Sequence, residues 1–179
     1  MSTDTVTVER GESVVNAVRA GIAGGFVGGL GMGVILHTGA NMMPLIGALY
    51  GWPTVIGGWA AHLANSIVIG VIFALIVSRP LVREQLTSVS EYTAAGLVYA
   101  AAVGLVMTGI VIPVAMQLLR VQTFPESLLP IPGVIGGVLV IISIGVAHMI
   151  FGLLLGATCG FLWCKLPDPT PSVHTRLGP

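Results

Sequence analysis

Residues 55–77 read VIGGWAAHLANSIVIGVIFALIV, a stretch without a single charged side chain. A helix advances about 1.5 Å per residue, so about 20 apolar residues cross the roughly 30 Å hydrocarbon core of a bilayer. This stretch therefore predicts a transmembrane helix. Three more stretches have the same character, at about 14–39, 93–116 and 134–163. Together they predict an all-α, polytopic integral membrane protein, a bundle of four transmembrane helices.

The composition excludes the other broad classes. Of the 179 residues, 55% are hydrophobic and only 8% are charged, whereas soluble domains carry charge on about a quarter of their residues. Disordered chains are rich in charge and poor in apolar residues, which is the opposite pattern. The net charge of zero argues against a nucleic-acid partner, because such binding needs a basic surface. The lipid bilayer is the partner that this composition indicates.

The placement of lysine and arginine predicts the orientation in a cell membrane. Positive residues near the ends of membrane helices stay on the cytoplasmic side. One side would carry six of them and the other only Arg120; the six are Arg10, Arg19, Arg79, Arg83, Lys165 and Arg176. Both termini are therefore expected in the cytoplasm. We expect residues 1–13 to form an N-terminal tail, 14–164 the membrane domain and 165–179 a disordered tail.

The two halves of the chain repeat a few residues at matching places. Gly21 and Met32 recur 75 positions later as Gly96 and Met107. Likewise His62 and Gly70 recur 86 positions later as His148 and Gly156. Each half would enter the membrane from the cytoplasm and return, which suggests two parallel helical-hairpin repeats.

Glycines at four-residue steps mark two helices for close packing. Helices in lipid associate through small residues that let their backbones approach. Such steps occur in the first predicted helix at Gly21, Gly25, Gly29 and Gly33, and in the fourth at Gly152, Gly156 and Gly160. His37 and His148 end the two series. Because these helices should be antiparallel, we expect the series to face each other, with His37 near His148.

Three histidines fall at one depth when counted from the basic residues at the inner boundary. His37 is 18 residues from Arg19, while His62 and His148 are each 17 residues from Arg79 and Lys165. That spacing places all three about 25 Å from the boundary. His62 shares its helix face with Asn65 and Ser66, and the third helix brings Met107 and Thr108 to the same layer.

Ionisable residues inside a membrane point to function, because they are costly unless partnered. His37, His62 and His148 are candidate cofactor or metal ligands. Two could bind a haem b axially, or three could bind copper or zinc; the methionines that could assist are Met42, Met43, Met107 and Met149. A simpler alternative is that each imidazole only hydrogen-bonds a neighbouring helix. A solute or proton pathway is a third interpretation.

No sequence motif of an enzyme is present, since HExxH, GxSxG and P-loop patterns are absent. We therefore expect a non-catalytic protein. The first hypothesis is an accessory or assembly subunit of a respiratory or redox membrane complex, in contact with other subunits or further copies of itself. The alternatives are a small channel or solute-permeation protein, and a purely structural bundle.

Three stretches resemble a group of small, uncharacterised four-helix membrane proteins of bacteria and halophilic archaea. They are AGIAGGFVGGLGMGV at 20–34, GWAAHLANSIVIGVIFALI at 58–76 and AHMIFGLLLGATCGFL at 147–162. The shared pattern is a histidine followed by spaced glycines. The resemblance implies a four-helix membrane fold and carries no activity with it.

Overall fold

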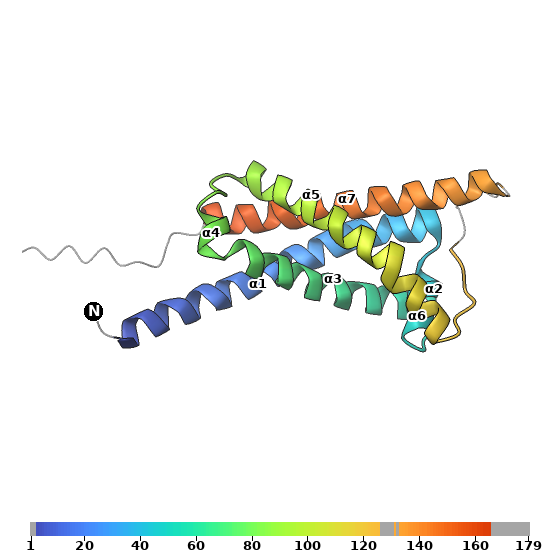
Figure 1. Ribbon diagram of the computed structural model, residues 1–179, viewed down its shortest axis with the longest axis horizontal. Coiled ribbons are helices and arrows are strands. Elements are labelled where there is room, and N and C mark those ends of the chain that lie inside the picture. Colours follow the sequence, from blue (N-terminus) through green and yellow to red (C-terminus); the bar gives the residue numbers. More distant parts are fainter. Residues whose placement is uncertain (1–2, 126–130, 132, 166–179) are drawn as a thin grey trace, which may run out of the picture.

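The protein is a four-helix membrane bundle. The computed structural model describes residues 3–125, 131 and 133–165, and every regular element in these ranges is helical. In chain order the elements are α1 (Thr3–Ala40), α2 (Met43–Leu49), α3 (Val55–Val77), α4 (Pro80–Arg83), α5 (Val89–Val106), the π-helical turn η1 (Met107–Val111), α6 (Ile112–Leu118) and α7 (Val134–Lys165). Figure 1 shows the long helices lying roughly along a common axis.

The four predicted membrane segments are confirmed. The segments long and apolar enough to cross a bilayer are Val14–Ala40, Val55–Val77, Val89–Leu118 and Val134–Trp163. Each begins or ends within four residues of its expected position, because the bilayer thickness fixes the length of apolar helix that a sequence must supply. α1 begins at Thr3, so helix also covers most of the expected N-terminal tail. In the expected C-terminal tail, 166–179 lie outside the described residues.

The helices form two hairpins. α1 packs against α3 in the first hairpin, α5 packs against α7 in the second, and α1 and α7 join the two hairpins. Figure 1 shows α5, η1 and α6 crossing the bundle, from beside α7 near α4 to beside α2 at the opposite end. We call these two ends of the bundle the α4 end and the α2 end.

Short polar signals fix where two of the long helices begin. The Thr54 hydroxyl accepts a hydrogen bond from the Gly57 amide at 3.0 Å and caps α3. At the start of α5, Ser88 and Glu91 form a capping box, in which one Glu91 carboxylate oxygen accepts the Ser88 amide at 3.0 Å. Such caps satisfy amides that the helix itself leaves free. They therefore set the entry points of α3 and α5.

The predicted glycine contact between α1 and α7 is wrong in its partners. A Cβ added at Gly21 would lie 2.6 Å from Val71 Cα, and one at Gly25 would lie 2.5 Å from Ser66 O, so this series faces α3. A Cβ at Gly152 would lie 2.5 Å from Gly96 O, on α5. The rest of the two series follows the same partners: Gly29 and Gly33 face α3, while Gly156 and Gly160 face α5.

α1 and α7 are nevertheless close, through a second set of glycines on α1. Gly24 packs on Leu155 and Gly28 packs on Phe151. Because Gly39 packs on Ser143, His148 lies about one helical turn nearer the α4 end than His37 does. The expected pairing of His37 with His148 is therefore wrong by about one turn.

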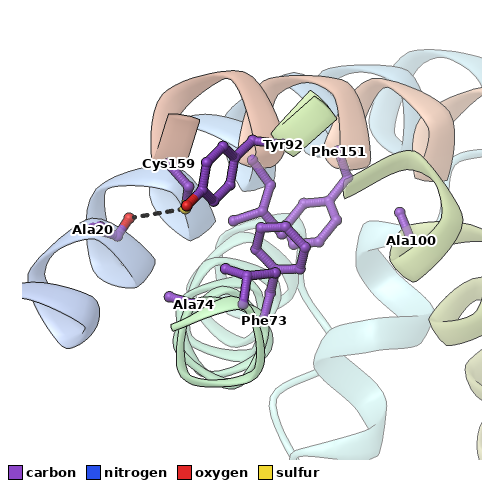
Figure 2. Close-up of a cluster of buried hydrophobic side chains, with 9 residues drawn as sticks. Ala20, Phe73, Ala74, Tyr92, Ala100, Phe151 and Cys159 are labelled. Atoms are coloured by element: carbon purple, nitrogen blue, oxygen red, sulfur yellow. Dashed lines mark hydrogen bonds between the residues drawn. The ribbon is translucent and has the colours of Figure 1, made fainter. Parts of the chain in front are cut away.

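The α4 half of the bundle is filled with side chains. Phe73, Tyr92, Phe151 and Leu155 are all buried there, and Figure 2 shows the aromatic rings converging between the helices. The Cys159 thiol donates to the Ala20 carbonyl at 3.6 Å, the dashed contact in Figure 2. These described side chains fill the interior of the α4 half.

The segment between the first two membrane spans contains a packed helix, α2. α2 turns back into the bundle, and Met43 and Leu45 are fully buried. Asn41 allows this sharp reversal by adopting a positive φ of 43°, a conformation that asparagine tolerates better than most residues. α2 therefore covers the α2 end of the first hairpin.

Candidate functional site

A cavity of about 230 Å³ lies between the two hairpins in the α2 half. α1, α2, α3, α7 and the continuous α5–η1–α6 segment all contribute to its wall. Phe151 belongs both to the buried core and to the cavity lining, so it marks the boundary between them. None of the described residues that line the cavity carries a formal charge. The lining includes Met32, Met42, Tyr50, His62, Asn65, Ser66, Met107, Thr108, Ile144, His148 and Phe151.

His62 and His148 both line this cavity. His62 Nε2 lies 2.9 Å from the Gly29 carbonyl oxygen, and His148 Nδ1 lies 2.9 Å from the Ile144 carbonyl oxygen. Both side chains are buried, with exposed fractions of 6% and 7%. Two of the three predicted histidines are thus brought to one site.

The carbonyl partners determine which ring nitrogen carries the proton. A carbonyl oxygen only accepts hydrogen bonds, so His62 Nε2 and His148 Nδ1 must be the N–H donors. In a neutral imidazole the other nitrogen then has a free lone pair. His62 Nδ1 and His148 Nε2 are therefore the acceptor or ligand atoms that this site offers.

His37 takes a separate position. Its ring centroid lies 6.2 Å from that of Trp59, and the His62 ring centroid lies at the same distance from Trp59. His37 Nδ1 is buried without a hydrogen-bond partner, and His37 is not among the cavity-lining residues. The predicted single layer thus splits, because His37 packs near Trp59 and does not line the cavity that His62 and His148 share.

Two of the remaining polar groups of the cavity, Tyr50 and Asn65, are paired with each other, and a third, Thr108, bonds to the backbone of its own helix. The Tyr50 hydroxyl donates to Asn65 Oδ1 at 2.8 Å, and the Thr108 hydroxyl donates to the Gly104 carbonyl at 2.6 Å. Tyr50 had no signal in the sequence beyond its position at a membrane boundary. The Tyr50–Asn65 bond joins the α2 region to α3.

Methionine is the other residue type concentrated at the cavity. Met32, Met42 and Met107 line it, whereas Met43 packs into the neighbouring hydrophobic cluster. Met149 is 38% exposed and lines a groove on the outside of the second hairpin. Of the methionines proposed from sequence as soft ligands, Met42 and Met107 are therefore placed at the site. Met32 was missed, although its recurrence as Met107 in the repeat was a usable signal.

A π-helical turn shapes one wall of the cavity. In η1 the Ile112 amide donates to the Met107 carbonyl, five residues back, where an α-helix would bond four residues back. Pro113 follows and has no amide hydrogen to donate. The turn carries Met107 and Thr108 into the cavity lining, so a local departure from the α-helix builds the site. Such turns often occur at functional sites.

A groove reaches His148 from the outer surface of the second hairpin. It runs between α5–η1 and α7 and shares Thr108, Ile144 and His148 with the cavity lining. A Cβ at Gly109 or at Gly145 would meet nothing within 4 Å, so these glycines leave the groove open. These three shared residues form the partition between the lipid-facing groove and the cavity.

The three-histidine metal site is not formed. No group of three or more His, Cys, Asp or Glu side chains in the described ranges is arranged to hold a metal ion. His62 and His148 line the cavity, whereas His37 does not. No family model, curated protein or solved structure matches the chain.

Proposed function

We propose that the chain is a non-catalytic multi-pass membrane protein that holds a small guest in the cavity between its hairpins. His62 and His148 are the groups that recognise it. The observation that carries the proposal is their burial at one uncharged cavity, each with one ring nitrogen free to accept a hydrogen bond or a metal. A guest that supplies a hydrogen-bond donor or a metal ion to these lone pairs gains binding energy.

The volume of the cavity limits the guest. An apolar cavity of about 150 Å³ is large enough for benzene, whereas sites for drug-sized ligands occupy about 300–1,000 Å³. At about 230 Å³ the cavity suits a single ring or a metal ion. It is smaller than a haem requires, which favours the smaller candidates among the predicted cofactors.

The closed α4 half favours a binding role over permeation. Phe73 and Leu155 are 1% and 0% exposed, and together with Phe151 they fill the path from the cavity toward the α4 end. A single copy therefore offers a site with one closed end. A guest would enter and leave on the same side.

The accessory or assembly role in a larger membrane complex remains part of the proposal, with both termini in the cytoplasm. Its support is the uncovered third span, of which only 11% of the most apolar window is buried. Val98 and Leu105 on α5 are 72% and 75% exposed, so this face is available to lipid or to another subunit. Copurification of a defined partner in mild detergent would identify the host complex.

The test of the binding role is native mass spectrometry of the full chain released from mild detergent, with absorption spectra and metal analysis. We expect a bound guest on the wild-type protein and its loss from the His62→Leu/His148→Leu double variant. His37→Leu is the matched control and should keep the guest, because His37 lies outside the cavity lining. Circular dichroism should show equal helix content in all three. A wild-type protein without any guest, or a double variant that retains it, would refute the proposal.

A further inference from the structure

The cavity combines two soft side-chain types from matching positions of the two hairpins. Met32 recurs as Met107 and His62 recurs as His148, and all four line the same cavity. Each hairpin therefore supplies one thioether sulfur and one imidazole. The repeat explains why the four residues line one cavity, since equivalent positions of two paired hairpins occupy equivalent places in the bundle.

The protonation of the histidines leaves ligand atoms available. His62 Nδ1 and His148 Nε2 keep their lone pairs because the opposite nitrogens donate to backbone carbonyls. A histidine that binds a metal almost always donates its other N–H to a carbonyl, a carboxylate or water, which fixes the ring. Both histidines already have this second hydrogen bond.

A set of two thioether and two imidazole ligands favours one kind of metal ion. Thioether sulfur is a soft ligand that favours Cu(I), while imidazole binds Zn and Cu alike. Two neutral imidazoles and two thioethers bring no negative charge, and no described residue of the lining is charged. Burying a divalent cation without counter-charge costs far more than burying a monovalent one. The chemistry therefore favours a soft monovalent cation over Zn²⁺.

We propose that the cavity is a Cu(I) site, with Met32, Met107, His62 and His148 as its ligands. This inference rests on the proposed function and names the guest. Met42, which also lines the cavity, supplies a third thioether beside this set. The burial of the two histidines would then serve to keep water and other ligands away from the ion.

The test is an anaerobic Cu(I) titration of the full chain in detergent, in competition with bicinchoninate, a chelator that forms a coloured Cu(I) complex. We expect one equivalent of Cu(I) per chain, and no retention of Zn²⁺ under the same conditions. The key variant is Met32→Leu/Met107→Leu, because leucine nearly conserves the volume of methionine and the fold should survive. Loss of a mere outer-shell partner costs about 10- to 100-fold in metal affinity, so this variant should lose at least about 100-fold.

The matched control is Met43→Leu/Met116→Leu, which replaces two methionines outside the cavity lining. It should bind Cu(I) as the wild type does. X-ray absorption at the copper edge should show sulfur and nitrogen scattering in the wild type, and the sulfur contribution should fall in Met32→Leu/Met107→Leu. Absence of Cu(I) binding, or equal affinity in the two double variants, would overturn the inference. If an organic guest is found instead and depends on His62 and His148, the binding role stands and the Cu(I) assignment fails.

Discussion

The two hairpins, α1 with α3 and α5 with α7, are alike in one half of the bundle and different in the other. They share their contacts near the α4 end and differ toward the α2 end. Near the α4 end, Gly21 packs on Gly70 in the first hairpin, and Gly96 packs on Gly156 in the second. These are the recurring residues of the two repeats. Glycine backbones therefore meet at equivalent places, and the α4 halves of the hairpins are built alike.

Toward the α2 end the two hairpins diverge at their histidines. His62 packs beside Gly33, where Trp59 also fills the space between α1 and α3. The position 86 residues after Trp59 is Gly145, which has no side chain and leaves the groove open. The position 75 residues after Gly33 is Thr108, in the π-helical turn. One hairpin is thus closed by a large aromatic ring, and the other opens where that ring is missing.

This difference indicates that a repeated scaffold can be stabilised in one half and specialised in the other. Close glycine contacts hold the α4 halves together in both hairpins. Three changes in the second hairpin then create room: the loss of the tryptophan, the π-helical turn and the proline after it. The cavity lies where the repeat is imperfect.

The largest effect is expected where a glycine backbone touches another backbone. A Cβ added by Gly70→Ala would lie 2.5 Å from Gly21 O and 2.6 Å from Gly25 Cα, and neither atom can move without shifting a helix. We expect Gly70→Ala to lower the free energy of unfolding by about 1–3 kcal/mol, measured by SDS-induced unfolding in mixed micelles.

Gly137→Ala is the control for that prediction, because a Cβ at Gly137 meets nothing within 4 Å. It should leave stability unchanged or raise it by up to about 1 kcal/mol, since alanine favours helix. The equivalent change in the second hairpin, Gly156→Ala, would contact Tyr92 O and should cost as much as Gly70→Ala. A harmless Gly156→Ala would contradict the equivalence of the two α4 halves.

A smaller effect should distinguish the two histidines. The hydrogen bond of His62 crosses from α3 to α1, whereas that of His148 stays within α7, four residues back. Interhelical hydrogen bonds in membranes contribute about 0.6 kcal/mol on average. We therefore expect His62→Leu to lower the free energy of unfolding by about that amount and His148→Leu to leave it nearly unchanged. An equal decrease in the free energy of unfolding for both variants would contradict the expected difference between the interhelical and the intrahelical hydrogen bond.

The smallest effect is kinetic and concerns the groove of the second hairpin. With Cys159 and Cys164 replaced by alanine, Thr108→Cys places a thiol in the partition between groove and cavity. N-phenylmaleimide, which partitions into lipid, should label it. Adding Gly145→Trp should slow the labelling, because the ring then fills the groove as Trp59 fills the first hairpin.

Gly137→Trp is the control for the groove, since Gly137 lies on the same helix but does not line the groove. It should leave the labelling rate unchanged, as followed by mass spectrometry. Equal rates with and without Gly145→Trp would mean that the reagent reaches position 108 by another route.

The sequence predicted the membrane spans well and the helix partners poorly. Spans are fixed by a single physical length, the thickness of the hydrocarbon, so uncharged stretches such as 55–77 predict them directly. Which helices pack together depends on which face of each helix lies toward which neighbouring helix. α1 has glycines on two faces, Gly25 toward α3 and Gly28 toward α7, and a four-residue step says nothing about which neighbour each face meets.

The sequence predicted the site residues where their depth in the membrane could be counted along a helix. Counting from the basic anchors correctly brought His62 and His148 to one level, because both helices are regular along that length. It failed for His37 since α1 is shifted by about one turn against α7. The contribution of Met107 and Thr108 was expected from depth, but the π-helical turn that presents them has no signature in the sequence beyond Pro113.

The π-helical turn also determines how stiff the cavity is. α6 is joined to the rest of the bundle mainly through this turn, and its backbone lies close to few residues of the long helices. One missing α-helical bond and one proline separate it from α5. Ile112 and Ala115, on α6, belong to the cavity lining. The cavity can therefore expand or contract by bending at a single turn, a soft mode that leaves the glycine contacts of the α4 half untouched.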